Sequence, residues 1–245
     1  MSDQTIVLNK HVEHSSVPKK ILQNYERLCS VMEDRQDWSK KTEEEMWHEM
    51  CFCILSANVS FELAKSCIEV LKYLGHLSPE WIIKNEKSSE TLFHVLSSPI
   101  FRPQKKDGSL RKYRYPKKRA DQITEAAKFI YSQNNSIKDV LKKIDSDIEA
   151  RNFFVHNIPG LGIKEASHFL RNIGFSDSLA ILDVHMLEFL RQRSLIHLKK
   201  GTALTKKIYL KIEDILRRYV TFHKLNLAIF DLAVWYYMRS IRRKY

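Results

Sequence analysis

The sequence is sparing with glycine and has no long apolar run. It contains only six glycines in 245 residues, and three of them, Gly160, Gly162 and Gly174, fall in the stretch HNIPGLGIKEASHFLRNIGFSDSLAILDVH, residues 156–185. Because a bilayer-spanning helix needs roughly 18 to 20 apolar residues, we expect no membrane association. The first residues, MSDQTIVLNKHVEHSSVPKK, have neither the apolar core of a signal peptide nor a transit-peptide pattern. We therefore expect an intracellular protein, in the cytoplasm or nucleoid, or in the nucleus if the source is eukaryotic.

Cysteine is also scarce. The four cysteines, all in the first third of the chain, are Cys29, Cys51, Cys53 and Cys67. Cys51 and Cys53 would point in different directions on a helix, and the C-x-x-C pairs typical of zinc sites are absent from the sequence. In a reducing compartment these residues are more simply buried small apolar side chains than disulfides. The sequence thus predicts no metal, no iron–sulfur cluster and no other cofactor.

Negative charge is in the minority. The chain has 41 Lys and Arg against 29 Asp and Glu, which gives a net charge of +12 and a pI of about 9.5. A basic protein of this kind suits a polyanionic partner, because neutralising phosphates releases counterions. The segment RPQKKDGSLRKYRYPKKR, residues 102–119, interleaves Tyr113 and Tyr115 among its cations and predicts a nucleic-acid surface. The alternative is a solvated cationic loop.

Strand signals are weak throughout, and helix signals dominate. The segment TEEEMWHEMCFCILSAN, for example, opens with Thr42 and Glu45 in capping-box spacing and then becomes apolar at helical intervals. We predict an all-α protein, with an exposed, hairpin-like loop over 99–115. The expected helices cover residues 42–58, 60–75, 78–85, 88–96, 116–133, 137–144, 147–156, 164–173, a short stretch after Asp183, 203–222 and 225–242.

The glycines of IPGLGIKEA predict a tight turn between two helices. Pro159 cannot continue the first helix, and Gly160 and Gly162 permit the positive φ angles that a sharp reversal needs. The second helix then starts near Ile163 with its free N–H groups pointing out of the turn. Such a helix start with exposed glycine amides suits a phosphate. A turn that only reverses the chain is the alternative.

Two charged residues near this turn predict chemistry. Lys164 stands in the first turn of its helix, where the helix dipole disfavours a cation. The dipole therefore favours the neutral amine, which is a nucleophile. Asp183 follows an apolar run, so its carboxylate is expected to be half-buried at a helix start. A carboxylate near a reactive amine can accept its proton and stabilise a developing cation. The alternatives are a surface lysine reaching for water and a plain N-cap aspartate, although the N-cap and catalytic roles of Asp183 can hold together.

IPGLGIKEA followed by LDVH, with its aspartate nineteen residues after the lysine, resembles the helix-hairpin-helix DNA glycosylases. The longer match KEASHFLRNIGF…AILDVH, with EMCFCILSAN upstream, is similar to the archaeal-type (type two) 8-oxoguanine DNA glycosylases, and the likeness runs from about residue 47 to 237. The resemblance implies an all-α fold of two helical lobes over residues 1–245, with the helix-hairpin-helix motif at about 148–173.

The resemblance also implies roles for the residues of the turn and of LDVH. Lys164 would be the amine that attacks C1′ of the damaged nucleotide, and Asp183 would activate it and support the oxocarbenium-like transition state. The amides around Gly160 and Gly162 would hold a DNA phosphate, and His185 would hold another. Lysine at this position marks the bifunctional glycosylase/AP lyases.

Two further groups of side chains face DNA in this interpretation. Asn58 matches the polar residue that fills the gap left by the flipped base and faces the orphaned cytosine; its alternative role is an N-cap for the helix from Ser60. The segment 105–119 would contact the DNA backbone, with Arg114 and Tyr115 inserted beside the lesion or contacting the opposite strand.

The base pocket is the last part that the resemblance supplies. Trp235 would form a pocket wall, although its spacing would equally place it in the core. Asp231 is a weaker candidate that would otherwise pair with a nearby arginine. Lys244 would be the analogue of a basic C-terminal residue near the pocket, but Tyr245 follows it here.

The function implied is a bifunctional DNA repair enzyme that excises 8-oxoguanine from double-stranded DNA. The lysine would form a Schiff base with the sugar, and β-elimination would then cleave the strand 3′ to the abasic site, without a metal. We expect it to act as a monomer. Two alternatives remain: a glycosylase for another oxidised base, such as a pyrimidine, and a non-catalytic helix-hairpin-helix module that only grips phosphates.

Overall fold

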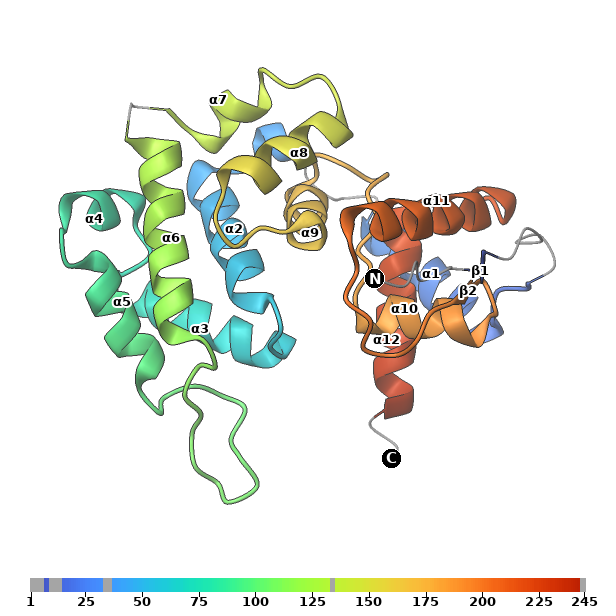
Figure 1. The fold of residues 1–245 in the computed structure, drawn as a ribbon, viewed down its shortest axis with the longest axis horizontal. Helices are drawn as coiled ribbons and strands as arrows, with labels where there is room; N and C mark the ends of the chain where they lie inside the picture. The colour runs from blue at the N-terminus through green and yellow to red at the C-terminus, as the bar shows by residue number, and fades with distance from the viewer. Residues whose placement is uncertain (1–6, 9–14, 33–36, 133–134, 243–245) are drawn as a thin grey trace, which may run out of the picture. The chain divides into compact units, whose positions relative to one another are not determined.

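The computed structural model describes residues 7–8, 15–32, 37–132 and 135–242, and the chain divides into two compact units (Figure 1). The middle unit covers Asp37–Ile173, and the terminal unit combines Met1–Gln36 with Gly174–Tyr245. Within the described ranges the only strands are two pairs of residues, β1 (Val7–Leu8) and β2 (Ile196–His197), which pair antiparallel in the terminal unit. The all-α prediction is confirmed.

The middle unit consists of helices arranged around α2. Its described elements, in chain order, are η2 (Trp38–Lys40), α2 (Glu43–Ser56), α3 (Phe61–Tyr73), α4 (Pro79–Lys84), α5 (Ser88–Ser97), α6 (Pro116–Tyr131), α7 (Ile137–Leu141), α8 (Asp147–Asn157) and α9 (Ile163–Ile173). Helix α2 packs against α3, α6, α7 and α9, and α8 packs against α9. Half of the residues of α2 are accordingly buried: Met46, Trp47, Met50, Cys51, Cys53, Ile54 and Leu55.

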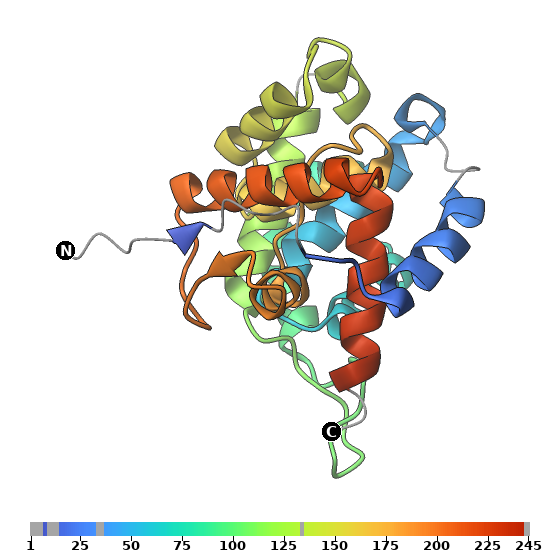
Figure 2. The ribbon, with the colours of Figure 1, turned by 90° about the vertical axis from the view of Figure 1, so that its right-hand side faces the viewer.

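The terminal unit pairs the two ends of the chain. Its described helices are α1 (Lys19–Met32), α10 (Val184–Gln192), α11 (Lys206–Phe222) and α12 (Leu227–Arg242). Helices α1 and α12 lie side by side although they come from opposite ends of the sequence, and α10 also packs on α12 (Figure 2). Asn24 of α1 donates a hydrogen bond to the carbonyl of Ala233, 3.4 Å away.

Most of the predicted helices are present within a few residues of their expected bounds. Serine and threonine N-caps explain several of the starts, because their hydroxyls accept from backbone N–H groups of the first turn; the caps are Ser60, Ser78, Ser136, Ser146 and Thr205. Helix α11 begins at Lys206 rather than at the expected residue 203, because Thr205 provides the cap. Helix α1 was not predicted.

The cysteines lie where small apolar side chains are expected. Cys51, Cys53 and Cys67 are fully buried, Cys29 is half-buried, and all four are free thiols. Burial raises the pKa of the buried thiols, which keeps them protonated. No helix within the described ranges is both long enough and apolar enough to cross a bilayer.

The loop before α6 is hairpin-like, as predicted, but two side chains of the basic segment 102–119 point inward. Phe101 and Arg111 form an antiparallel bridge, and the Lys105 amide donates to the carbonyl of Ser109 at 2.8 Å. Tyr113, expected on a nucleic-acid surface, is buried, and its hydroxyl donates to the Leu55 carbonyl at 2.7 Å. Arg119, counted in the basic segment, is 5% exposed. Those two expectations were wrong, because both side chains satisfy backbone carbonyls inside the unit.

We expect Thr42→Ala to lower the stability of the middle unit by about 1 kcal/mol, because it removes an N-cap. The Thr42 hydroxyl accepts from the Glu45 amide at 3.1 Å, while the Glu45 carboxylate accepts from the Thr42 amide at 2.7 Å. Urea denaturation followed by circular dichroism measures the change. Thr221→Ala, an exposed threonine in the last turn of α11, is the control and should change stability by less than about 0.5 kcal/mol. Equal losses in the two variants would contradict the capping argument.

Candidate active site

The glycine turn lies between α8 and α9, where the chain passes close to two other helices. The Leu161 amide donates to the Ile158 carbonyl at 3.2 Å, which closes the turn. Gly160 has φ +93°, and a Cβ there would lie 2.8 Å from Gln122 Oε1 and 3.2 Å from Ile54 Cγ2. Backbone conformation and space therefore both require glycine at this position.

A buried arginine holds Gln122 against the turn. Arg119 Nη1 donates to Gln122 Oε1 at 2.6 Å, and Nη2 donates to the Ala57 carbonyl at 3.1 Å. The guanidinium thus ties α6 to the C-terminal end of α2, directly behind the glycine hairpin. Its function in the fold is to position the turn, although its place in a run of cations had indicated a DNA contact.

The start of α9 offers backbone N–H groups to an anion. The amides of the first helical turn have no partner within an α-helix, because the residues four positions earlier lie outside it. Gly162 is exposed and its carbonyl accepts from Ala166 at 2.9 Å, so α9 is regular from its first residue. A phosphate at this helix start would meet donated N–H groups and the positive end of the helix dipole.

Lys164 is the second residue of α9 and is half-buried. Its side chain is 27% exposed, and its Nζ lies 3.1 Å from Oε1 of Glu165, whose side chain is 15% exposed. Glu165 was not among the residues predicted from the sequence. The signal was available, since an acidic residue directly follows the candidate nucleophile in GIKEA.

Further toward the C-terminal end of α9, polar side chains face α2. Asn172 Nδ2 donates to Glu49 Oε1 at 2.8 Å, and the Cys53 thiol donates to the same oxygen at 3.6 Å. Surrounding protein raises the pKa of the Glu49 carboxyl by desolvation, and Cys53 also interacts electrostatically with Lys164. Burial, assisted by the charges of Arg171 and Lys164, holds the pKa of His168 well below its usual value, so this imidazole is neutral.

Asp183 lies in the terminal unit and caps α10. Its Oδ1 accepts from the amides of His185 and Met186, each at 2.8 Å, and its φ and ψ are extended. The N-cap role predicted for Asp183 is therefore confirmed. The cap fixes the orientation of the carboxylate and uses only one of its two oxygens in these bonds.

Aromatic and cationic side chains lie beside His185, the last residue of LDVH. The ring of His185 lies edge-on to Trp235 of α12 at a centroid distance of 6.5 Å, and Arg239 lies over the Trp235 ring at 4.2 Å. Trp235 is half-buried, so it is neither a core residue nor a fully exposed one. Asp231, one turn earlier on α12, is buried. Lys244 lies outside the described residues.

The remaining DNA-contact candidates are on the surface of the middle unit. Asn58 is exposed in the turn between α2 and α3 and has φ +63°, a left-handed conformation that asparagine tolerates. Its alternative role as an N-cap is wrong, because Ser60 caps α3. Arg114 is exposed and lies 5.0 Å over the ring of Tyr115, so the two side chains form one stacked surface just before α6.

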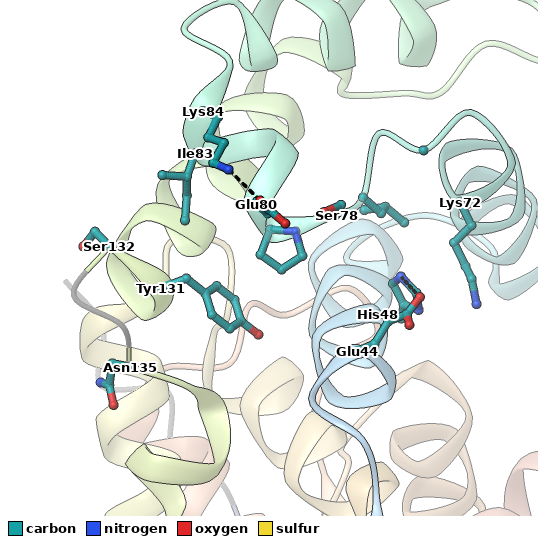
Figure 3. Close-up of a pocket in the computed structure, with 13 residues that line it drawn as sticks. Glu44, His48, Lys72, Ser78, Glu80, Ile83, Lys84, Tyr131, Ser132 and Asn135 are labelled. Carbon is teal, nitrogen blue, oxygen red and sulfur yellow. Dashed lines mark hydrogen bonds and ion pairs between the residues drawn. The ribbon is translucent and has the colours of Figure 1, made fainter.

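A cavity of about 980 Å³ opens elsewhere in the middle unit (Figure 3). It is lined by residues of α2, α4 and the end of α6, including His48, Glu80 and Tyr131. Several of its charges are paired within it, such as Lys84 with Glu80 at 2.6 Å. A base pocket needs a stacking surface within reach of the reacting amine, and none of the candidate catalytic residues lines this cavity. A second cavity of about 390 Å³ lies against Glu49 and Asn172.

Comparison with known proteins shows which family has this architecture. The family model described as 8-oxoguanine DNA glycosylase matches residues 28–225 of the chain. This chain belongs to the 8-oxoguanine DNA glycosylase family. The resemblance inferred from the turn and LDVH is thereby confirmed.

Glycosylases similar to this chain occur in archaea and in Thermotoga. The 8-oxoguanine DNA glycosylase/AP lyase of Methanocaldococcus jannaschii is 34% identical over 205 residues, which are 84% of this chain and 86% of that protein. The corresponding Saccharolobus solfataricus protein is 31% identical over 222 residues, or 89% of this chain and 95% of that protein.

Solved structures of the family show the same fold. The M. jannaschii 8-oxoguanine glycosylase/lyase, in complex with a 15mer DNA containing 8-oxoguanine, matches with a TM-score of 0.68 at 32% identity, covering 89% of this chain and 94% of that one. The Thermotoga maritima 8-oxoguanine DNA glycosylase matches with a TM-score of 0.65 at 32% identity, over 89% and 93% of the two chains. The helix-hairpin-helix fold class is confirmed.

Gly160→Ala tests the close approach of the turn. We expect a loss of about 2 to 4 kcal/mol, because the variant combines backbone strain at positive φ with contact against Gln122 and Ile54. Gly201→Ala is the matched control: Gly201 has φ +83°, but a methyl group added there would meet nothing within 4 Å, so only the strain of about 1 kcal/mol remains. Urea midpoints measure both. A Gly160→Ala variant no less stable than Gly201→Ala would contradict the crowding.

Glu49→Gln tests the desolvated carboxyl. Since burial raises the folded-state pKa of Glu49, the native protein loses stability as pH rises from the ordinary glutamate range through that raised value. Glutamine keeps an acceptor for Asn172 and carries no charge. We therefore expect the variant to melt above the native protein at pH 8, with the difference shrinking toward pH 4. Glu69→Gln, an exposed acid of α3, should show no such pH-dependent gain. A lower melting temperature for Glu49→Gln at pH 8 would contradict the argument.

Proposed function

We propose that this protein is a bifunctional repair enzyme that excises 8-oxoguanine from double-stranded DNA and cleaves the strand 3′ to the resulting abasic site. The observation that carries the proposal is a half-buried lysine, Lys164, in the first turn of the helix that follows a glycine-forced hairpin. Backbone binding needs the hairpin alone. A partly desolvated amine beside the phosphate-binding amides serves covalent chemistry on a nucleotide.

The chemistry begins with removal of the base from the stack, because C1′ of a stacked nucleotide is shielded. The lone pair of Lys164 Nζ forms a bond to C1′ while the glycosidic bond breaks, and the base leaves with the electron pair of the glycosidic bond and takes up a proton. Asp183 supports the positive charge that develops on the sugar, since its carboxylate is held in place by the α10 cap.

Strand cleavage follows from the covalent bond. The sugar ring opens to give a Schiff base between Lys164 and C1′. Loss of a proton from C2′ then expels the 3′ phosphate, and hydrolysis of the imine releases the lysine. The Schiff base acts as an electron sink, so the sequence of steps uses no metal.

DNA contacts are assigned to both units. In the middle unit, the amides around Gly160 and Gly162 hold one phosphate, Asn58 fills the gap left by the base, and Arg114 with Tyr115 contacts the duplex beside the lesion. The exposure of Asn58 and Arg114 supports these roles. A stacked arginine–tyrosine pair offers both charge and a flat apolar face to nucleic acid.

In the terminal unit, His185 holds a second phosphate, and Trp235 with Asp231 lines the base pocket. The contact between His185 and Trp235 supports this assignment, because it joins a phosphate ligand to a stacking surface. Lys244 remains a candidate for the same pocket. We propose that the enzyme acts as a monomer inside the cell, where its DNA substrate is found.

The decisive test is borohydride trapping on a duplex with 8-oxoguanine opposite cytosine, in EDTA. Borohydride reduces a Schiff base to a stable amine, so the native protein should give a covalent protein–DNA band. Lys164→Gln should give none while still binding the duplex. Lys143→Gln, an exposed lysine after α7, is the matched control and should trap like the native protein.

Each of the other possible results would indicate a different function or a different nucleophile. A band with an oxidised pyrimidine but none with 8-oxoguanine would keep the lysine chemistry and replace the substrate. No band with any lesion or with an abasic site, despite tight DNA binding, would mean a non-catalytic helix-hairpin-helix module. A band that persists in Lys164→Gln would assign the amine to another residue.

A further inference from the structure

Lys164 and Glu165 form an ion pair that the geometry of a helix does not favour. Consecutive residues on an α-helix project about 100° apart, so their side chains normally diverge. Here Nζ and Oε1 approach to 3.1 Å, and both side chains are largely withdrawn from water, with 27% and 15% of their surfaces exposed. The pair is therefore more than two solvated surface charges that happen to meet.

The second oxygen of Glu165 lies close to Gly162 of the hairpin. A Cβ at position 162 would lie 3.0 Å from Glu165 Oε2, so the carboxylate occupies space that only glycine at this position leaves open without displacement. One oxygen thus faces the Lys164 amine while the other lies against Gly162. Gly162 has two functions in this arrangement: its carbonyl accepts a hydrogen bond from Ala166 at the start of the helix, and it leaves room for an acid beside the lysine.

A lysine nucleophile must first lose a proton, because an ammonium has no lone pair to attack C1′. We propose that Glu165 is the group that takes this proton from Lys164, an inference that rests on the proposed function of Lys164. In the step, an N–H bond of the ammonium breaks and an O–H bond forms on Glu165. The product is a neutral amine beside a neutral carboxylic acid, with no change in net charge.

The other groups near Lys164 are poorly suited to this role. His168 has its pKa held well below the usual value by burial and by nearby cations, so it is a weak base. Burial raises the pKa of the Cys53 thiol, which therefore stays protonated and has no free site for another proton. Glu49 accepts hydrogen bonds from Asn172 and from Cys53 itself, so it is engaged with those groups.

Asp183 then has a different role from the one that the family resemblance first implied. Its Oδ1 already accepts two backbone hydrogen bonds at the start of α10, which fixes the carboxylate as a stationary negative charge. A fixed charge is suited to stabilising the cationic sugar of the transition state. Proton acceptance falls to Glu165, and charge stabilisation falls to Asp183.

The experiment compares single-turnover rates of 8-oxoguanine excision for the native protein, Glu165→Gln, Glu165→Asp and Glu149→Gln. Glu165→Gln keeps the size of the side chain and a hydrogen-bond acceptor but is not a base. Glu149 stands at the same third position of α8 and is exposed, so Glu149→Gln controls for loss of a first-turn carboxylate in this motif. Melting temperature and duplex affinity are measured for every variant.

We expect Glu165→Gln to slow excision on the order of a hundredfold, the usual effect of losing a general base, with melting temperature and duplex affinity close to native. Its rate should rise with pH more steeply than the native rate, because hydroxide from solvent replaces the missing base. Glu165→Asp, which keeps a carboxylate, should recover part of the loss, and Glu149→Gln should excise at the native rate.

Three results would overturn the inference. The first is a Glu165→Gln rate within twofold of native or faster, since the carboxylate would then only restrain the ammonium. The second is an equal loss in Glu149→Gln, which would reduce the effect to the loss of a carboxylate from the first turn of a helix. The third is a Glu165→Asp variant as slow as Glu165→Gln. If the native protein itself excises no 8-oxoguanine, the proposed function fails. The reaction of the native protein therefore tests the function, and the variants test the role of Glu165.

Discussion

The close approach of the hairpin to the helices behind it is the constraint on which the proposed active site of the middle unit depends. At Gly160 the backbone lies so near Gln122 and Ile54 that no side chain fits, and the buried Arg119 holds Gln122 in that place. This contact fixes where α9 begins. Since Lys164 and the amides proposed to bind phosphate lie at the start of α9, their positions follow from the packing of a short turn.

The polar groups between α2 and α9 form a small hydrogen-bonded network centred on Glu49. Asn172 and Cys53 both donate hydrogen bonds to Oε1 of Glu49. This buried carboxyl between α2 and α9 therefore has hydrogen-bond partners inside the protein. Such a network costs stability when its acid is ionised. Its hydrogen bond from Asn172 joins α9 to α2.

The sequence predicted the elements whose cause is local and missed those whose cause is tertiary. The caps of α2 and α10 and the glycine turn follow from short-range rules, so Thr42, Asp183 and Gly160 were placed correctly. Arg119 and Tyr113 were misplaced because a run of cations and aromatics has the same composition whether a member points outward or satisfies a buried carbonyl. Glu165 escaped notice because neighbouring residues on a helix are expected to diverge. Helix α1 depends on packing with α12, close to the other end of the chain.

The two carboxylates argued to serve the reaction differ in how they are held, and this difference separates their functions. Asp183 is anchored by two backbone amides, so its charge stays where the cap places it. Glu165 is held by the lysine itself and by the space over Gly162, so its bond to Nζ changes when the proton moves. A rigid charge stabilises a transition state best when nothing must reorganise, whereas a proton acceptor must touch its donor. One acid could not satisfy both demands, because a carboxylate that gains a proton loses the charge with which it would stabilise the sugar.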